Sequence, residues 1–116
     1  MNRIKTITKK EDFDKLYRKS GSAGSRHVVV LYRKNGLSES RQAFIASKKV
    51  GNSVQRNRAR RLMKEAYRLT DEQVSGGYDI AFIARNGIDA CKCADVQRSI
   101  EAALKRAGLT GGTGRE

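Results

Sequence analysis

Lysine and arginine crowd one stretch of the chain, from Ser47 to Arg68. Eight of its 22 residues are lysine or arginine, and Glu65 is the only carboxylate among them. On a helix, cations without acidic partners nearby repel one another and destabilise the fold, unless an external polyanion neutralises them. A solvated basic helix, the plain alternative, would be expected to carry more carboxylates. The chemistry indicated here is therefore phosphate binding.

The whole chain carries the same bias. Its 116 residues hold 25 lysines and arginines against 12 aspartates and glutamates, a formal net charge of +13. Such a positive field favours a polyanionic partner, such as a nucleic acid. The length allows one domain with a thin hydrophobic core and excludes a two-domain enzyme with a cleft between lobes.

One long helix is expected to present these cations. Asn52 can cap it, with Gln55 at the return position of a capping box, and nothing breaks the pattern before Asp71. At ~100° per residue, five apolar side chains fall within an arc of about 140°, and five cations are expected on the opposite side. The apolar set is Ala59, Leu62, Met63, Ala66 and Tyr67, and the cationic set is Arg56, Arg60, Arg61, Lys64 and Arg68.

Two further features extend this candidate surface. Asn57 adds a hydrogen-bond acceptor among donors, which suits bases or 2′-hydroxyl groups. Lys48 and Lys49 lie in the loop before the helix, where backbone amides and the helix dipole attract phosphate. The candidate binding residues are Lys48, Lys49, Asn52, Arg56, Asn57, Arg58, Arg60, Arg61, Lys64 and Arg68.

The other predicted elements surround this helix. A capping box at Thr8 and Glu11 predicts a first helix with an apolar stripe of Phe13, Leu16 and Tyr17. Ser, Gly and Ala then predict a flexible segment over 20–25. Two antiparallel strands over 27–33 and 41–47 are expected to be joined by a polar loop.

The second half completes an α+β sandwich. Residues 78–85 read as a buried central strand, and an apolar stripe over 96–107 predicts a last helix that Gly108 closes. The order helix, strands, helix, strand, helix indicates a single-domain α+β fold over 1–107. Residues 108–116 are expected to form a flexible Gly-rich tail.

The sequence gives little support for a zinc site, a catalytic triad, a protein-held Mg²⁺ site or a membrane span. Cys91 and Cys93 with the single His27 fall short of four zinc ligands, and one histidine within an apolar strand makes a catalytic triad improbable. Acidic residues on the first helix could hold Mg²⁺, but helix-dipole complementarity explains them as well. No apolar run is long enough to span a membrane, and the two cysteines suit a reducing compartment, so the chain is expected in the cytoplasm.

The motifs themselves point to a family. Lys48-Lys49-Val50-Gly51-Asn52, followed by Arg56-Asn57-Arg58 and Arg60-Arg61, closely resembles the signature of the bacterial ribonuclease P protein component. The resemblance covers roughly residues 5–107, because the first helix, the two-strand stretch and the later strand fall in the family's order. It implies a left-handed crossover through the basic helix, which general topology rules disfavour.

The resemblance also implies a function. The protein would bind ribonuclease P RNA and help it remove the 5′ leader from precursor tRNA, while the RNA and its Mg²⁺ carry out hydrolysis. The basic helix would contact the RNA, and the leader would bind in a cleft formed with Phe13, Tyr17 and Tyr32. Two departures are Lys64, where the family has arginine, and the strand aromatic, which falls at Leu31 or Tyr32; strand alternation allows only one of these to face the cleft. We expect Tyr32. For Phe13 and Tyr17 a plain core role stays open.

Two other functions share the charge pattern. A structural ribosomal or other RNA-packing protein would have a similar net charge but would need no aromatic cleft. A helix-turn-helix DNA-binding protein is disfavoured, because strands, not a short helix and turn, precede residues 52–69.

Overall fold

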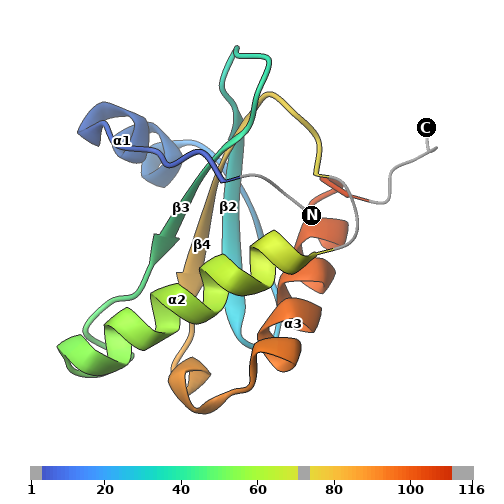
Figure 1. Cartoon of the computed structure of the whole chain (residues 1–116). Helices are drawn as coiled ribbons and strands as arrows, with labels where there is room; N and C mark the ends of the chain where they lie inside the picture. Colours follow the sequence, from blue (N-terminus) through green and yellow to red (C-terminus); the bar gives the residue numbers. More distant parts are fainter. Residues whose placement is uncertain (1–3, 71–73, 111–116) are drawn as a thin grey trace.

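The computed structural model describes residues 4–70 and 74–110. Along this part of the chain, helices and strands follow in the predicted order, which confirms the α+β class (Figure 1). The elements are α1 (Lys10–Arg18), β1 (Gly21–Gly24), β2 (Val28–Lys34), β3 (Arg41–Ile45), α2 (Ser53–Leu69), β4 (Tyr78–Ala84), the short 3-10 helix η1 (Ile88–Ala90) and α3 (Cys93–Arg106).

The four strands form one mixed sheet in the order β1-β2-β4-β3. β4 is central, as its apolar run predicts, and pairs antiparallel with β2 and parallel with β3. The strands β2 and β3 run antiparallel and are joined by a loop over 35–40, as predicted, but they do not pair with each other, because β4 lies between them. A strand that is apolar on both faces gains most from an interior position, where both of its backbone edges are also hydrogen-bonded.

The segment over 20–25, predicted to be flexible, contains the edge strand β1, which pairs with β2. Gly21 lies opposite Tyr32 in this ladder. A Cβ atom on Gly21 would come within 2.4 Å of the Tyr32 ring. Glycine is thus needed here for close approach of an aromatic ring, and hydrogen bonding to β2 overrides the weak strand propensity of the segment.

The connection from β3 through α2 to β4 is left-handed. In Figure 1 the two parallel strands point downward, α2 passes in front of the sheet, and β4 lies to the right of β3. Right-handed crossovers are found in about 98% of such units. The left-handed crossover implied by the family resemblance is thus present.

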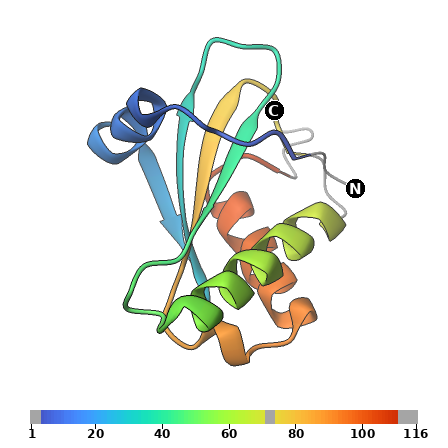
Figure 2. The ribbon, with the colours of Figure 1, turned by 60° about the vertical axis from the view of Figure 1, so that its left-hand side comes forward.

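Helices cover both faces of the sheet. Figure 2 shows α1 on one side and α2 with α3 on the other. The larger core, between the sheet and α2 and α3, includes Val30, Phe82, Met63 and Leu104. The smaller core, under α1, is built from Ile7, Leu16, Ala43 and Ala81. The α2 side chains predicted to be apolar and inward are confirmed in this role, with Leu62 only partly buried.

The start of α1 differs from the prediction. Its N-cap is Lys9, without a side-chain capping bond, so the capping box at Thr8 does not form. The reason lies in the preceding residues, which extend along the free edge of β3: the Ile7 amide donates to the Gln42 carbonyl at 2.9 Å, and the Gln42 amide donates to the Lys5 carbonyl at 2.7 Å. Pairing with the sheet keeps the chain extended past the predicted cap.

The C-terminal boundary also shifts. Gly108 has a φ of 78° and follows the end of α3, as predicted. Leu109 and Thr110 are buried, however, so the expected tail is wrong for its first residues. Residues 111–116 lie outside the described part of the chain, as does Asp71, the predicted break after α2. Among the described residues, no helix has the length and apolar character needed to cross a membrane.

Candidate nucleic-acid interface

The start of α2 is fixed by its own sequence. Asn52 accepts a hydrogen bond from the Gln55 amide at 3.0 Å, and the Gln55 side chain accepts one from the Asn52 amide at 2.8 Å. The predicted capping box is confirmed. Gly51 has a φ of 146°, and a Cβ atom there would come within 2.0 Å of the Gln55 amide oxygen, so only glycine fits. This turn leaves Lys48 and Lys49 exposed beside the helix.

The outer surface of α2 is cationic. We call the six basic or amide residues listed at the end of this paragraph the cationic face. Arg58, Arg61 and Lys64 are exposed, whereas Arg56 and Arg60 are half-buried. The prediction that these two arginines lie opposite the buried face is therefore wrong: they border it. The reason is that, at ~100° per residue, Arg56 falls between Met63 and Tyr67 on the helical wheel and Arg60 falls next to Tyr67, so both side chains are partly covered. The residues of the cationic face are Asn57, Arg58, Arg60, Arg61, Lys64 and Arg68.

Local partners restrain some of these side chains. Arg68 forms an ion pair with Glu65 at 2.7 Å, and this hydrogen bond lowers the pKa of the Glu65 carboxyl. Arg60 donates to the Asn57 amide oxygen. Within residues 4–70 and 74–110, no carboxylate pairs with Lys48, Lys49, Arg58, Arg61 or Lys64. Counted over the described residues, this surface therefore holds an excess of positive charge, which an outside anion would neutralise.

The α1 side of the sheet carries the predicted aromatic pair. Phe13 is partly buried against the smaller core, and Tyr17 is 58% exposed. Phe13 thus combines a packing role with a free edge, and Tyr17 projects into solvent.

Tyr32 does not join them. It packs partly buried against the larger core, on the opposite face of the sheet, and its ring contacts Tyr78 at 6.5 Å between centroids. The prediction that Tyr32 lines one cleft with Phe13 and Tyr17 is wrong. Side chains alternate along a strand, and it is Leu31 that packs against the α1 core. The residue of this strand that faces α1 is therefore aliphatic.

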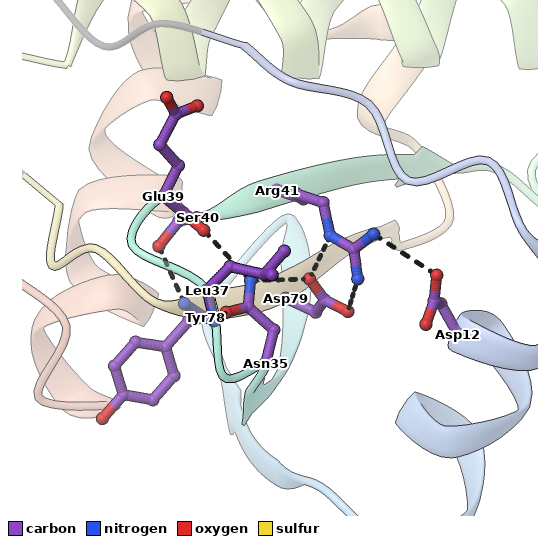
Figure 3. Close-up of polar contacts among 8 residues, drawn as sticks. All are labelled: Asp12, Asn35, Leu37, Glu39, Ser40, Arg41, Tyr78 and Asp79. Carbon is purple, nitrogen blue, oxygen red and sulfur yellow. Dashed lines mark hydrogen bonds and ion pairs between the residues drawn. The ribbon is translucent and has the colours of Figure 1, made fainter.

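A polar network ties α1 to the sheet (Figure 3). Arg41 donates two hydrogen bonds to the nearly buried Asp79 carboxylate, at 2.8 and 2.7 Å, and lies 3.3 Å from an Asp12 oxygen. Asn35 also donates to Asp79, at 3.0 Å. Bonding to Asp79 raises the pKa of Arg41, so this cation persists. The network was not predicted, although a lone aspartate within an apolar strand is a signal that could have indicated it.

A second polar contact lies inside the larger core. The Gln42 amide nitrogen donates to the Tyr67 hydroxyl at 3.1 Å, and both side chains are buried. Burial raises the pKa of Tyr67 to about 12, more than the Gln42 bond lowers it. Tyr67 therefore attaches α2 to β3 by packing and by one hydrogen bond.

One of the two cysteines, Cys91, meets the histidine in space. The Cys91 sulfur lies 3.6 Å from Nδ1 of His27, which strand and helix packing bring together across 64 residues. Among the described residues, no three histidine, cysteine, aspartate or glutamate side chains gather as a metal site. The Asp12 carboxylate, one of those considered for Mg²⁺, instead pairs with Arg41.

Comparison with known proteins bears directly on this surface. The sequence profile of the family described as Ribonuclease P matches residues 1–108. The chain belongs to this family. It is 42% identical to the ribonuclease P protein component of Clostridioides difficile, over 94% of this chain and 96% of that protein. It is 39% identical to that of Pelotomaculum thermopropionicum, over 92% and 96% of the two chains.

Solved structures agree with this assignment. The Staphylococcus aureus RNase P protein superposes with a TM-score of 0.79 at 30% identity, covering 92% of this chain and 98% of that one. The Thermotoga maritima RNase P protein gives 0.77 at 26% identity, covering 88% and 96%. Membership of the family associates the chain with tRNA processing, within an endoribonuclease complex whose RNA partner is ribonuclease P RNA.

Proposed function

We propose that this chain is the protein subunit of ribonuclease P, that it binds ribonuclease P RNA through α2 and the loop before it, and that it holds the 5′ leader of precursor tRNA on the α1 side. The observation that carries the proposal is a set of cations without a carboxylate partner among the described residues, in a chain of this family: Lys48, Lys49, Arg58, Arg61 and Lys64. Lysine and arginine that neutralise phosphates supply the affinity, and α2 presents them from a rigid, capped helix.

The two RNA contacts lie on opposite sides of the sheet. Ribonuclease P RNA would bind Lys48, Lys49 and the cationic face, with Arg56 at its border. The single-stranded leader would stack on Tyr17 and the free edge of Phe13. Stacking of this kind is sequence-tolerant and contributes about 1–3 kcal/mol per base, which suits a subunit that handles many precursors.

In this proposal the chain contributes position and charge, and the RNA carries the chemistry. Mg²⁺, held mainly by the RNA, would supply the activated water for phosphodiester hydrolysis. We also propose that the protein acts in the cytoplasm, where precursor tRNA is found.

Reconstitution tests the proposal. The chain is mixed with ribonuclease P RNA at low Mg²⁺ concentration, and cleavage of precursor tRNA is followed. We expect the chain to stimulate cleavage, because its cations replace part of the ionic screening that Mg²⁺ otherwise provides. A double variant, Arg58→Ala with Arg61→Ala, should stimulate much less than the matched variant Arg98→Ala with Lys105→Ala on α3. Lack of stimulation by the unmodified chain would favour an RNA-packing protein.

The leader contact has its own test. Tyr17→Ala should weaken binding of leader-bearing precursor by roughly tenfold, the loss of one stacked base, and should spare mature tRNA. Binding to the holoenzyme is measured for both RNAs. Equal losses for the two would remove Tyr17 from the leader contact.

A further inference from the structure

A hollow of about 450 Å³ opens between α2 and the outer edge of the sheet. Its walls combine cations, an amide, a hydroxyl and an aromatic ring. They are formed by Thr6, Phe44, Asn57, Arg60, Arg61 and Lys64. The hollow lies on the α2 side of the sheet and is thus separate from the α1 side that carries Phe13 and Tyr17.

The orientation of the Phe44 ring gives the hollow a flat floor. Phe44 and Phe82 are neighbours across β3 and β4, and their rings are stacked, with centroids 5.3 Å apart and an interplanar angle of 9°. Phe82 covers the face of the Phe44 ring that is directed at β4, Tyr67 packs at a tilt with 6.1 Å between ring centroids, and Phe44 lines the hollow with its remaining, outer side. Thr6, which bridges to Gln42 along that edge, lines the same hollow.

The helix α2 and the segment before α1 place polar groups around this ring. Asn57 accepts a hydrogen bond from Arg60 through its amide oxygen, so its amide nitrogen is the group that can donate to a ligand. Arg61 and Lys64 follow on the same side of α2 and are exposed. An aromatic face, a donor, a hydroxyl and two cations together match one nucleotide: a base on the ring and phosphates on the cations.

We propose that this hollow binds one unpaired base of ribonuclease P RNA, stacked on the outer face of Phe44, with its flanking phosphates on Arg61 and Lys64. The proposal rests on the proposed function and deepens it. A helix that bound only the phosphate backbone would need no aromatic floor. The stacked base would fix where along the RNA the helix docks, which phosphate contacts alone do not do.

The salt dependence of binding separates stacking from charge. Phe44→Leu should weaken binding to ribonuclease P RNA by about fivefold to tenfold and leave the slope of log affinity against log salt unchanged. Phe44→Tyr keeps the ring and should bind as the unmodified chain does. Leu37→Ala, which removes an exposed apolar side chain from the loop between β2 and β3, should leave affinity for this RNA unchanged.

A fluorescent variant keeps the test decisive if Phe44→Leu folds poorly. The chain contains no tryptophan, so Phe44→Trp introduces a single reporter at the floor of the hollow. Its emission should be quenched as ribonuclease P RNA is added, and the midpoint of quenching should match that of the binding curve. Leu37→Trp, at an exposed position in the loop between β2 and β3, should keep its emission.

The outcomes separate the two proposals. If the unmodified chain does not bind ribonuclease P RNA, the proposed function fails. If it binds, but Phe44→Leu binds equally well or the emission of Phe44→Trp stays constant, the base-binding hollow alone is overturned.

Discussion

Cations on α2 differ in how freely they can meet a phosphate. Arg68 is held by Glu65, and Arg60 is bonded to Asn57, so both are partly pre-oriented. Arg61 and Lys64 are exposed, with no carboxylate partner among residues 4–70 and 74–110. An arginine can bind a phosphate through two parallel hydrogen bonds, which a lysine cannot do. Arg58 and Arg61 both meet these conditions, and Arg61 also lines the hollow beside Phe44, so we expect the largest individual effect from Arg61.

Removing that arginine gives a prediction at the residue scale. Arg61→Ala should weaken binding to ribonuclease P RNA and reduce the slope of log affinity against log salt by roughly one, the loss of one phosphate contact. Affinity is measured across a salt series. Arg98→Ala, which removes an exposed arginine from α3 instead, is the control and should leave the slope unchanged. The same slope for Arg61→Ala and the unmodified chain would place Arg61 outside the interface.

Tyr67 provides a prediction about stability and pH. Its folded-state pKa of about 12 lies above the ordinary value of 10.0. Between these values the unfolded chain loses the phenol proton while the folded chain keeps it, so folding stability falls as pH rises from about 10 to about 12. The loss should be on the order of 2 kcal/mol.

Denaturant unfolding between neutral pH and pH 11.5 or so measures this loss. Tyr67→Phe removes the titrating group and should flatten the alkaline fall. Near neutral pH the same variant should be less stable by about 1–3 kcal/mol, because Gln42 loses a buried acceptor. Tyr17→Phe, at an exposed tyrosine, is the control. An alkaline fall as steep in Tyr67→Phe as in the unmodified chain would contradict the argument.

At the scale of elements, α1 is attached to the sheet by few contacts. Leu16 is its one buried residue, Phe13 is partly buried, and the Asp12–Arg41 ion pair joins the helix to β3. Arg41 is itself fixed by Asp79 on β4. The angle of α1, and with it the position of Tyr17, therefore depends on this ion pair.

Loss of the Asp12–Arg41 ion pair should weaken recognition of the leader. Asp12→Asn removes the charge and should reduce the preference for leader-bearing precursor over mature tRNA by about 1 kcal/mol, roughly fivefold. Binding to ribonuclease P RNA alone should not change, because α2 lies on the other face. Glu11→Gln removes an exposed charge from the same helix and serves as the control. Should Asp12→Asn keep the full preference, the ion pair does not position α1.

At the scale of the whole molecule, the net charge of +13 acts on the fold itself. Like charges repel, so the free chain should be stabilised when salt screens them. Raising sodium chloride from about 0.01 M to about 1 M shortens the Debye length from about 30 Å to about 3 Å. The Tm should rise by several degrees in thermal melts. A Tm that stays level or falls over this range would show that internal ion pairs outweigh the repulsion.

Local sequence determined several features by itself. The capping box at Asn52, the buried face of α2, the interior strand β4 and the left-handed Gly108 each depend on residues close together in the chain. The lysine and arginine spacing identified the surface and the family for the same reason: a helix places side chains at fixed angles, whatever else the fold does.

Tertiary structure decided the rest. Strand partners depend on contacts across the sheet, so local patterns could not show that β4 separates β2 from β3, or that a Gly-rich segment becomes β1. Strand alternation allowed either Leu31 or Tyr32 to face α1, and only packing against the two cores chose Leu31. Arg41, Asp79 and Asp12 meet from three elements. Such meetings depend on long-range burial and charge, which no local pattern contains.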